Sequence, residues 1–197
     1  LGNGVKAIYQ VEFGISLTDT QNTAVTGNEP ITMRNSFVGL AGNFGTVLAG
    51  RHDTPLKIST GPLDLFADTM ADNNNTVGFQ DLRADNVIAY ISPSWTGFQL
   101  AAAVHAGGGA TAVGTFNNDA DSIAEAYSLA AIYKNGPWYA SAAYESLGDK
   151  LAGYTDAQID SPLYDGADWN KWRVGLGILD WNGFSLTGIY EHRDSEP

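Results

Sequence analysis

The residues that could act together on charged or polar molecules gather between positions 52 and 84. Three carboxylates recur there every four residues: Asp64, Asp68 and Asp72. Four apolar residues follow the i, i+3, i+4 and i+7 spacing of one helix face: Leu63, Phe66, Ala67 and Met70. Pro62 stands in a first-turn position. The pattern predicts a short helix over 61–75 with an acidic face, and an ordinary amphipathic surface helix is the alternative.

Enzymatic chemistry finds little support in the sequence. The three histidines, His52, His105 and His192, are isolated from one another, and neither an HExxH nor a GxSxG motif occurs. The glycine run at 107–109 lies in a loop before more polar residues, so it does not form a phosphate cradle after a strand. We therefore expect no enzyme activity, no catalytic residue, no metal centre and no cofactor.

The charge balance excludes further classes of protein. The 197 residues hold 22 acidic and 10 basic side chains, a formal net charge of −12, and no cysteine. Nucleic-acid binding needs clustered Lys and Arg, which this chain lacks. Without cysteine there is neither a disulfide scaffold nor a thiolate metal site, which suits a protein that crosses an oxidising periplasm.

Hydrophobic residues alternate with a period close to two along most of the chain, which is typical of β-strands. Nine such runs occur: 6–16, 34–42, 44–51, 85–93, 98–106, 125–133, 138–145, 171–179 and 184–193. In the eighth run the large apolar residues fall on one face: Trp172, Val174, Leu176 and Ile178. Small or polar residues occupy the other: Lys171, Arg173, Gly175 and Gly177. A soluble sandwich and a membrane barrel both show this alternation, so it leaves the two open.

The connections between these runs are alternately short and long. Four are tight and rich in turn formers, at 42–43, 94–97, 134–137 and 180–183. Four are long and polar, at 17–33, 52–84, 107–124 and 146–170. Aromatic residues stand at or beside the short turns: Phe44, Trp95, Phe98, Tyr133, Trp138, Trp181 and Phe184. Tight turns with an aromatic girdle at one end and long loops at the other indicate an outer-membrane barrel.

Several stretches resemble the trimeric general porins of Gram-negative bacteria. The opening run 1–12 is similar to the second strand of such porins, and 34–45 is similar to their next hairpin, which continues through Gly50 and Arg51 into a long third loop. Shorter matches follow along nearly the whole chain, at 83–86, 92–93, 97–98 and 135–137.

The resemblance implies an all-β fold, a sixteen-stranded antiparallel transmembrane β-barrel in the outer membrane of a Gram-negative bacterium. It also implies a homotrimer that lets small hydrophilic solutes and ions diffuse passively. Residues 1–197 would be part of one porin barrel domain, an internal fragment with about nine strands. Residues 52–84 would be the loop that folds inward and constricts the lumen.

The same resemblance assigns roles to charged residues. Porins of this type carry inward-pointing arginines on the barrel wall, and the matching positions are Arg34 and Arg83, with Arg51 at the base of the loop. Lys57 is a weaker member of this set. Together they would oppose the loop carboxylates across a narrow, wet gap. Beyond Arg83, counting by twos places four mostly apolar side chains in the lumen, a departure from the family: Asp85, Val87, Ala89 and Ile91.

The loop at 146–170 carries Asp149, Asp156, Asp160, Asp165 and Asp168 against Lys150 and the adjacent Lys171. Its carboxylates suggest weakly bound divalent cations, directly or as bridges to lipopolysaccharide, although the spacing fits no EF-hand and a solvated loop is the simpler interpretation. Two other functions stay open: a soluble all-β binding module, and a porin-fold envelope or adhesin protein with narrow solute selectivity.

Overall fold

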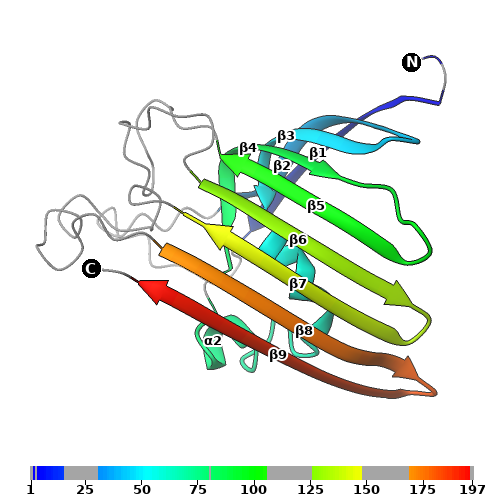
Figure 1. Ribbon diagram of the computed structural model, residues 1–197. Helices are drawn as coiled ribbons and strands as arrows, with labels where there is room; N and C mark the ends of the chain where they lie inside the picture. The colour runs from blue at the N-terminus through cyan, green and yellow to red at the C-terminus, as the bar shows by residue number, and fades with distance from the viewer. Residues whose placement is uncertain are drawn as a thin grey trace, which may run out of the picture.

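The computed structural model describes residues 2, 4–15, 31–79, 81–105, 126–147 and 169–195. Within these ranges nine strands form one sheet, and each strand pairs antiparallel with the next along the chain (Figure 1). Their bounds are β1 Lys6–Ile15, β2 Ile31–Gly42, β3 Gly45–Asp53, β4 Arg83–Ile91, β5 Phe98–His105, β6 Ala126–Asn135, β7 Trp138–Ser146, β8 Trp169–Trp181 and β9 Phe184–Ser195. The nine predicted strands are confirmed, and each end lies within three residues of its predicted place.

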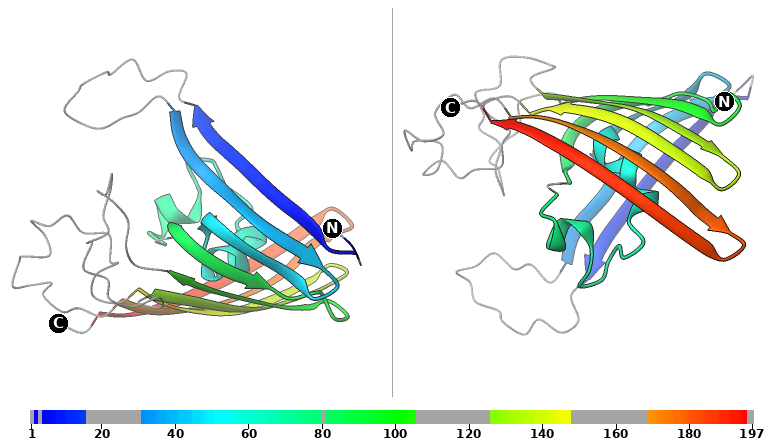
Figure 2. Two further views of the ribbon diagram at one scale, coloured as in Figure 1. Left: turned by 90° about the horizontal axis from the view of Figure 1, so that it is seen from above. Right: turned by 60° about the horizontal axis from the view of Figure 1, so that its bottom comes forward.

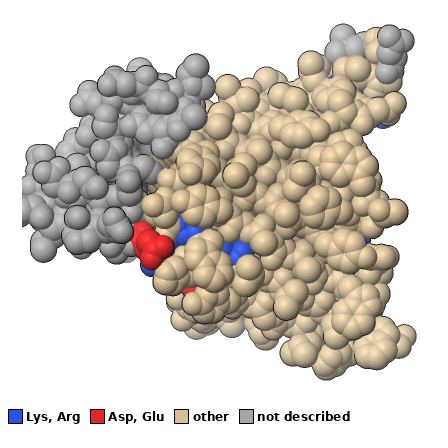
Figure 3. All heavy atoms as spheres, in the orientation of Figure 1, with Lys and Arg blue, Asp and Glu red and all other residues tan. Residues whose placement is uncertain are grey.

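The sheet curves like part of a barrel wall, with three short helical elements inside the curve (Figure 2). Its convex face exposes large apolar side chains along the strands: Tyr9 is 81% exposed, Val38 64% and Leu176 67%. Over β5–β9 this face carries very few charged atoms (Figure 3). A contiguous apolar surface of this extent needs an apolar neighbour, and the lipid-facing side of a transmembrane barrel has this character.

All seven aromatic residues that the sequence places beside the short turns are exposed, from Phe98 at 39% to Trp138 at 60%. The tight turns lie together at one end of the sheet (Figure 1). Aromatic side chains also stand towards the opposite ends of β6–β9, where Tyr127 contacts Tyr144 and Trp172 contacts Tyr190, with ring centroids 5.9 and 5.3 Å apart. Two aromatic levels separated by an apolar band match the two interfaces of a bilayer.

Residues 54–82, here called the inner segment, run across the concave face of the sheet (Figure 2). They contain α1 (Pro55–Thr60), the 3-10 helix η1 (Gly61–Leu63) and α2 (Asn73–Thr76). The Thr54 hydroxyl caps α1 by accepting from the Lys57 N–H, and Pro55 follows in the first turn, where its missing N–H costs nothing. Leu56, fully buried, packs on three inward-facing alanines of the wall: Ala101, Ala130 and Ala143.

The helix predicted over 61–75 is wrong in position. Between η1 and α2 the chain forms turns, and Asp68 adopts a left-handed backbone conformation with φ of 61° that ends any continuous helix. The predicted apolar face does not dock as a unit, because Leu63 is 1% exposed whereas Phe66 is 59% and Met70 95% exposed. The i, i+3, i+4 pattern there is a coincidence of spacing.

Counting by twos from Arg83 places Val87 and Ala89 on the inward face of β4, and the structure has them there, packed with Leu82 of the inner segment. Asp85 is the exception, because the pairing of β3 with β4 shifts register between Gly50 and His52 beside Asn86, whose φ is 54°, and the Asp85 side chain is 51% exposed and pairs with Arg51. Val87 and Ala89 are 1% and 5% exposed, because they pack in a cluster against which Leu82 of the inner segment lies. These small apolar residues help to seat the inner segment.

Among the described residues, no helix is long and apolar enough to cross a membrane.

Candidate functional site

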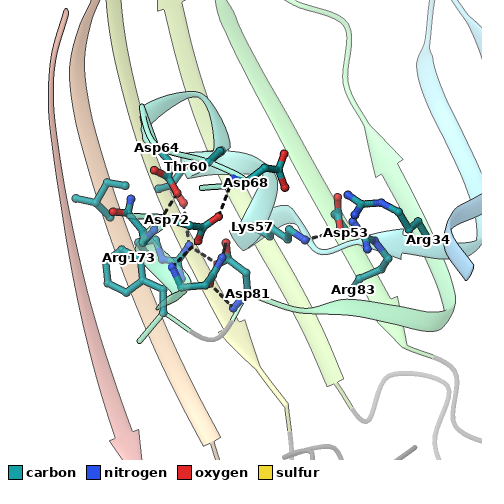
Figure 4. A pocket seen from close by; sticks show the side chains of 16 residues that line it. Arg34, Asp53, Lys57, Thr60, Asp64, Asp68, Asp72, Asp81, Arg83 and Arg173 are labelled. Carbon is teal, nitrogen blue, oxygen red and sulfur yellow. Dashed lines mark hydrogen bonds and ion pairs between the residues drawn. The ribbon is translucent and has the colours of Figure 1, made fainter. Parts of the chain in front are cut away.

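A cavity of about 300 Å³ lies between the inner segment and the wall, and charged side chains from both sides line it (Figure 4). Its basic residues are Arg34, Lys57, Arg83 and Arg173. Its acidic residues are Asp53, Asp64, Asp68, Asp72 and Asp81. Six of the seven residues that the sequence assigned to a constriction therefore meet around one cavity, and Arg51 is the exception.

The basic side of the cavity is built by β2 and β4. The pairing of β1 with β2 shifts register between Val11 and Phe13. At this bulge β2 has one residue more than β1, and Arg34 comes to lie opposite Glu12. Arg34 Nε lies 2.6 Å from Glu12 Oε1. Arg83 Nε donates to Asn35 Oδ1 at 2.8 Å. These contacts fix both guanidinium groups on the wall while leaving them in contact with the cavity.

Asp53, at the end of β3, ties the base of the inner segment to this wall. Its Oδ1 atom lies 2.9 Å from both Lys57 Nζ and Arg83 Nε, and its Oδ2 accepts from the Asn35 amide at 3.0 Å. The sequence prediction missed Asp53. The i, i+4 spacing of Asp53 and Lys57 across the start of α1 is the signal that would have found it.

The acidic side of the cavity is a turn whose carboxylates also hold its own backbone. Asp64 accepts hydrogen bonds from the N–H groups of Phe66 and Asn73, both at 3.0 Å. Asp72 accepts from the Asn74 N–H at 2.7 Å and the Asp68 N–H at 3.1 Å, and these two backbone donors lower the pKa of its carboxyl group. Asp68 is exposed, and its carboxylate extends from the turn towards the side of Arg34 (Figure 4).

A buried ionic cluster around Arg173 fastens the far side of the inner segment to β8 and β9. The side chain of Arg173 is 0% exposed, and its Nη1 atom donates to Thr60 Oγ1 at 2.8 Å and to Asp81 Oδ1 at 2.7 Å. Its Nε donates to Glu191 Oε2 at 2.7 Å, and its guanidinium carbon stands 4.5 Å from the centre of the Phe79 ring. The sequence prediction missed this cluster, although it placed Arg173 on the small or polar face of its strand.

Arg51 takes no part in lining the cavity. Its Nη1 atom lies 2.8 Å from Asp85 Oδ1 and its Nε donates to the carbonyl of Met33 at 3.1 Å. Met33 is 53% exposed among the outward-facing apolar residues. The structure therefore pairs Arg51 with Asp85 instead of bringing it to the loop carboxylates.

The expected cation-binding aspartates at 149–168 lie outside the described residues. Lys171 does not belong to that surface, because it is buried and its Nζ lies 2.9 Å from Glu145 Oε1 on the neighbouring strand. In the part of the chain that the structure describes, no group of three or more potential metal ligands gathers.

The charges around the cavity are arranged to act on ions. The four basic lining residues stand against five acidic ones, and β2 and β4 carry two of the bases while the turn at 64–72 carries three of the acids. Opposed charges across a small wet gap produce a local field that orients dipolar solutes and favours hydrated ions. The arrangement suits the passage or binding of ions.

Comparison with known proteins identifies relatives along the whole chain. A family model described as Gram-negative porin matches residues 1–197. The major outer membrane protein P.IB of Neisseria meningitidis is 32% identical over 141 residues, which cover 71% of this chain and 37% of that protein. P.IB of Neisseria gonorrhoeae is 51% identical over 57 residues, 29% of this chain and 14% of that protein.

Two solved structures share the fold. OmpF of Salmonella typhi, in complex with daunomycin, aligns with a TM-score of 0.65 at 16% identity, and the alignment covers 98% of this chain and 55% of the OmpF chain. An anion-selective porin from Comamonas acidovorans aligns with a TM-score of 0.53 at 20% identity, and the alignment covers 100% of this chain and 66% of that porin. At such identities the likeness concerns the fold. The chain spans less than two thirds of the length of the relatives it matches.

Proposed function

Because this chain belongs to the Gram-negative porin family, we propose that it forms the constricted part of an outer-membrane channel for passive diffusion of small hydrophilic solutes and ions. The relatives named as major outer membrane proteins locate it in the outer membrane of a Gram-negative bacterium. The family consists of channels and not of enzymes.

The observation that carries the proposal is the reversed polarity of the sheet. Apolar side chains such as Tyr9 and Leu176 are exposed on the convex face, whereas charged groups such as Arg83 and Asp64 lie around a cavity on the concave face. A soluble β-sheet module would bury the apolar face and expose the charged one. The soluble alternative therefore conflicts with the structure.

In the proposed channel, a hydrated ion passes between the acidic turn and the two wall arginines and keeps most of its water. Charged side chains replace the few water contacts that the ion loses. An apolar solute gains nothing from these groups and would displace water from them at a cost. Passage is driven by the concentration gradient alone, so no bound nucleotide or other energy source is required.

The proposed channel needs a closed wall. Within the described residues β1 pairs with β2 and β9 with β8, which leaves one edge of each open. An open strand edge is not tolerated in hydrocarbon, because its N–H and C=O groups lack partners. We propose that further strands complete a sixteen-stranded barrel, that three barrels form a trimer, and that the convex face contacts membrane lipid and lipopolysaccharide. Weak divalent-cation binding by the loop at 146–170 remains part of the proposal.

Purified full-length protein should insert into planar lipid bilayers and raise the current in discrete, equal steps. We expect equal steps because each inserted barrel adds one open water path, through which ions diffuse without any energy source. Single-channel recording in potassium chloride measures the steps, with detergent alone as the control. Protein that inserts, resists extraction by carbonate and yet carries no current would rule the channel out.

A further inference from the structure

One apolar side chain of the inner segment is fitted into a gap in the barrel wall. Leu63, the last residue of η1, is 1% exposed and packs with Ile132 of β6 and Tyr139 of β7. Beside it run two inward-facing glycines of β8, Gly175 and Gly177. They form a gap in the row of side chains, here called the glycine notch.

The notch accepts Leu63 only because neither position carries a Cβ atom. A Cβ at Gly175 would overlap Leu63 Cδ1 and would lie 2.9 Å from Ser141 Oγ and 3.2 Å from Thr60 Cγ2. A Cβ at Gly177 would lie 2.6 Å from Leu63 Cδ2. Carbon atoms in contact normally stand about 3.5–4.0 Å apart. Leu63 would therefore have to retreat from β8 by roughly 1 Å, the difference between these separations.

Elsewhere the wall tolerates a methyl group under the same segment. Leu56 of α1 rests on alanines of β5, β6 and β7, not on glycines: Ala101, Ala130 and Ala143. Among the glycines of the described strands, two alternate on the inward face only where η1 approaches β8. The difference indicates that the segment lies closer to the wall at Leu63 than at Leu56.

Leu63 is rigidly linked to the charged side of the cavity. The next residue, Asp64, accepts the N–H of Asn73 and so closes the turn that carries Asp68 and Asp72. On the other side of η1, Thr60 Oγ1 accepts a hydrogen bond from the buried Arg173, and the Ser59 carbonyl accepts one from Tyr139 at 2.9 Å. A displacement of the Leu63 backbone would therefore move the acidic turn with it.

We propose that the glycine notch sets the width of the constriction, by fixing how far the acidic turn stands from β8 and hence how near it comes to Arg34 and Arg83. The inference rests on the proposed function. Gly175 and Gly177 act as positioning residues, since they touch Leu63 and not the solute. Any side chain in the notch pushes the turn towards the opposite wall and narrows the gap.

Single-channel conductance of the full-length protein tests the notch. Gly175→Ala and Gly177→Ala should each lower the conductance per step, and Gly175→Val should lower it further, because the larger side chain displaces Leu63 more. Adding Leu63→Ala to Gly175→Ala should restore conductance towards the wild-type value, since the truncated side chain removes the closest of the three contacts, the overlap with Leu63. The matched control is Gly188→Ala on β9, where a Cβ would meet nothing within 4 Å. It should conduct like the wild type.

The outcomes separate the notch from the channel itself. Unchanged conductance in Gly175→Ala and Gly177→Ala, with the wild type conducting, would overturn the notch and leave the channel standing. Conductance lost without rescue by Leu63→Ala would also overturn it, as would misfolding of Gly175→Ala that Leu63→Ala does not repair. A wild-type protein that never conducts would refute the proposed function instead.

Discussion

Replacing Arg173 by alanine should destabilise the barrel and release the inner segment from β8. The substitution leaves the carboxylate of Asp81, which is 16% exposed, without its cation, and leaves Glu191, which is 3% exposed, with Arg193 alone. Breaking a buried ion pair by removing one partner costs roughly 3–5 kcal/mol. Thr60 loses its hydrogen bond to the wall in the same step. We expect a lower urea midpoint by tryptophan fluorescence, and noisy channels with a broad spread of conductance.

The matched control for this variant is Arg51→Ala. Arg51 also pairs with an aspartate, but Asp85 is 51% exposed and neither residue lines the cavity. Exposed pairs contribute at most about 1 kcal/mol, so stability and conductance should stay close to wild type. Arg173→Lys should fall between the two, because lysine keeps the charge but cannot reach Asp81 and Glu191 with one planar fork. If Arg173→Ala had the same urea midpoint and the same narrow spread of conductance as Arg51→Ala, the anchoring role of Arg173 would be contradicted.

Replacing Asp64 and Asp68 together by asparagine should shift the selectivity of the channel towards anions. The change removes two of the five negative charges that line the cavity, against four positive ones. In water a unit charge at ~5 Å changes the energy of a passing ion by about 0.8 kcal/mol, roughly a fourfold change in its local population. Asparagine also suits the positive φ of residue 68 and can keep one acceptor oxygen at residue 64.

The reversal potential across a potassium chloride gradient measures this shift. It should be larger at 0.1 M than at 1 M salt, because the screening length falls from about 10 Å to about 3 Å. Asp85→Asn is the control, since Asp85 pairs with Arg51 away from the cavity. Equal reversal potentials for the double variant and the wild type at low salt would remove these carboxylates from the permeation path.

The strands were predictable because one face of each strand contacts lipid and the other does not, so apolar residues recur at every second position of the sequence. The positions of the helices in the inner segment were not predictable in this way. Its apolar residues serve different surroundings: Leu63 fills the glycine notch, while Phe66 and Met70 are exposed. The better local signal was Thr54 followed by Pro55, an N-cap and first-turn pair that marks the start of α1.

The candidate site was predictable where the resemblance to porins assigned a role, as for Arg34 on β2 and Arg83 on β4, and not where side chains meet across distant parts of the chain. Arg173 reaches Thr60 across 113 positions of sequence and Asp81 across 92, separations that no local pattern reveals. Arg51 was assigned to the site from its place at the base of the segment. The register shift between Gly50 and His52 shows why position along a strand does not fix the face that a side chain occupies.

The most direct test of the account is whether a group attached to the inner segment obstructs the current. The 197 residues contain no cysteine, so within them a single introduced thiol is the only one to react. Ala67 lines the cavity, whereas Leu176 is 67% exposed on the convex face. Adding a charged, membrane-impermeant methanethiosulfonate reagent to open channels should reduce the current stepwise in Ala67→Cys and leave Leu176→Cys unchanged. Current that is unaffected in Ala67→Cys after confirmed labelling would contradict the placement of this segment in the pore.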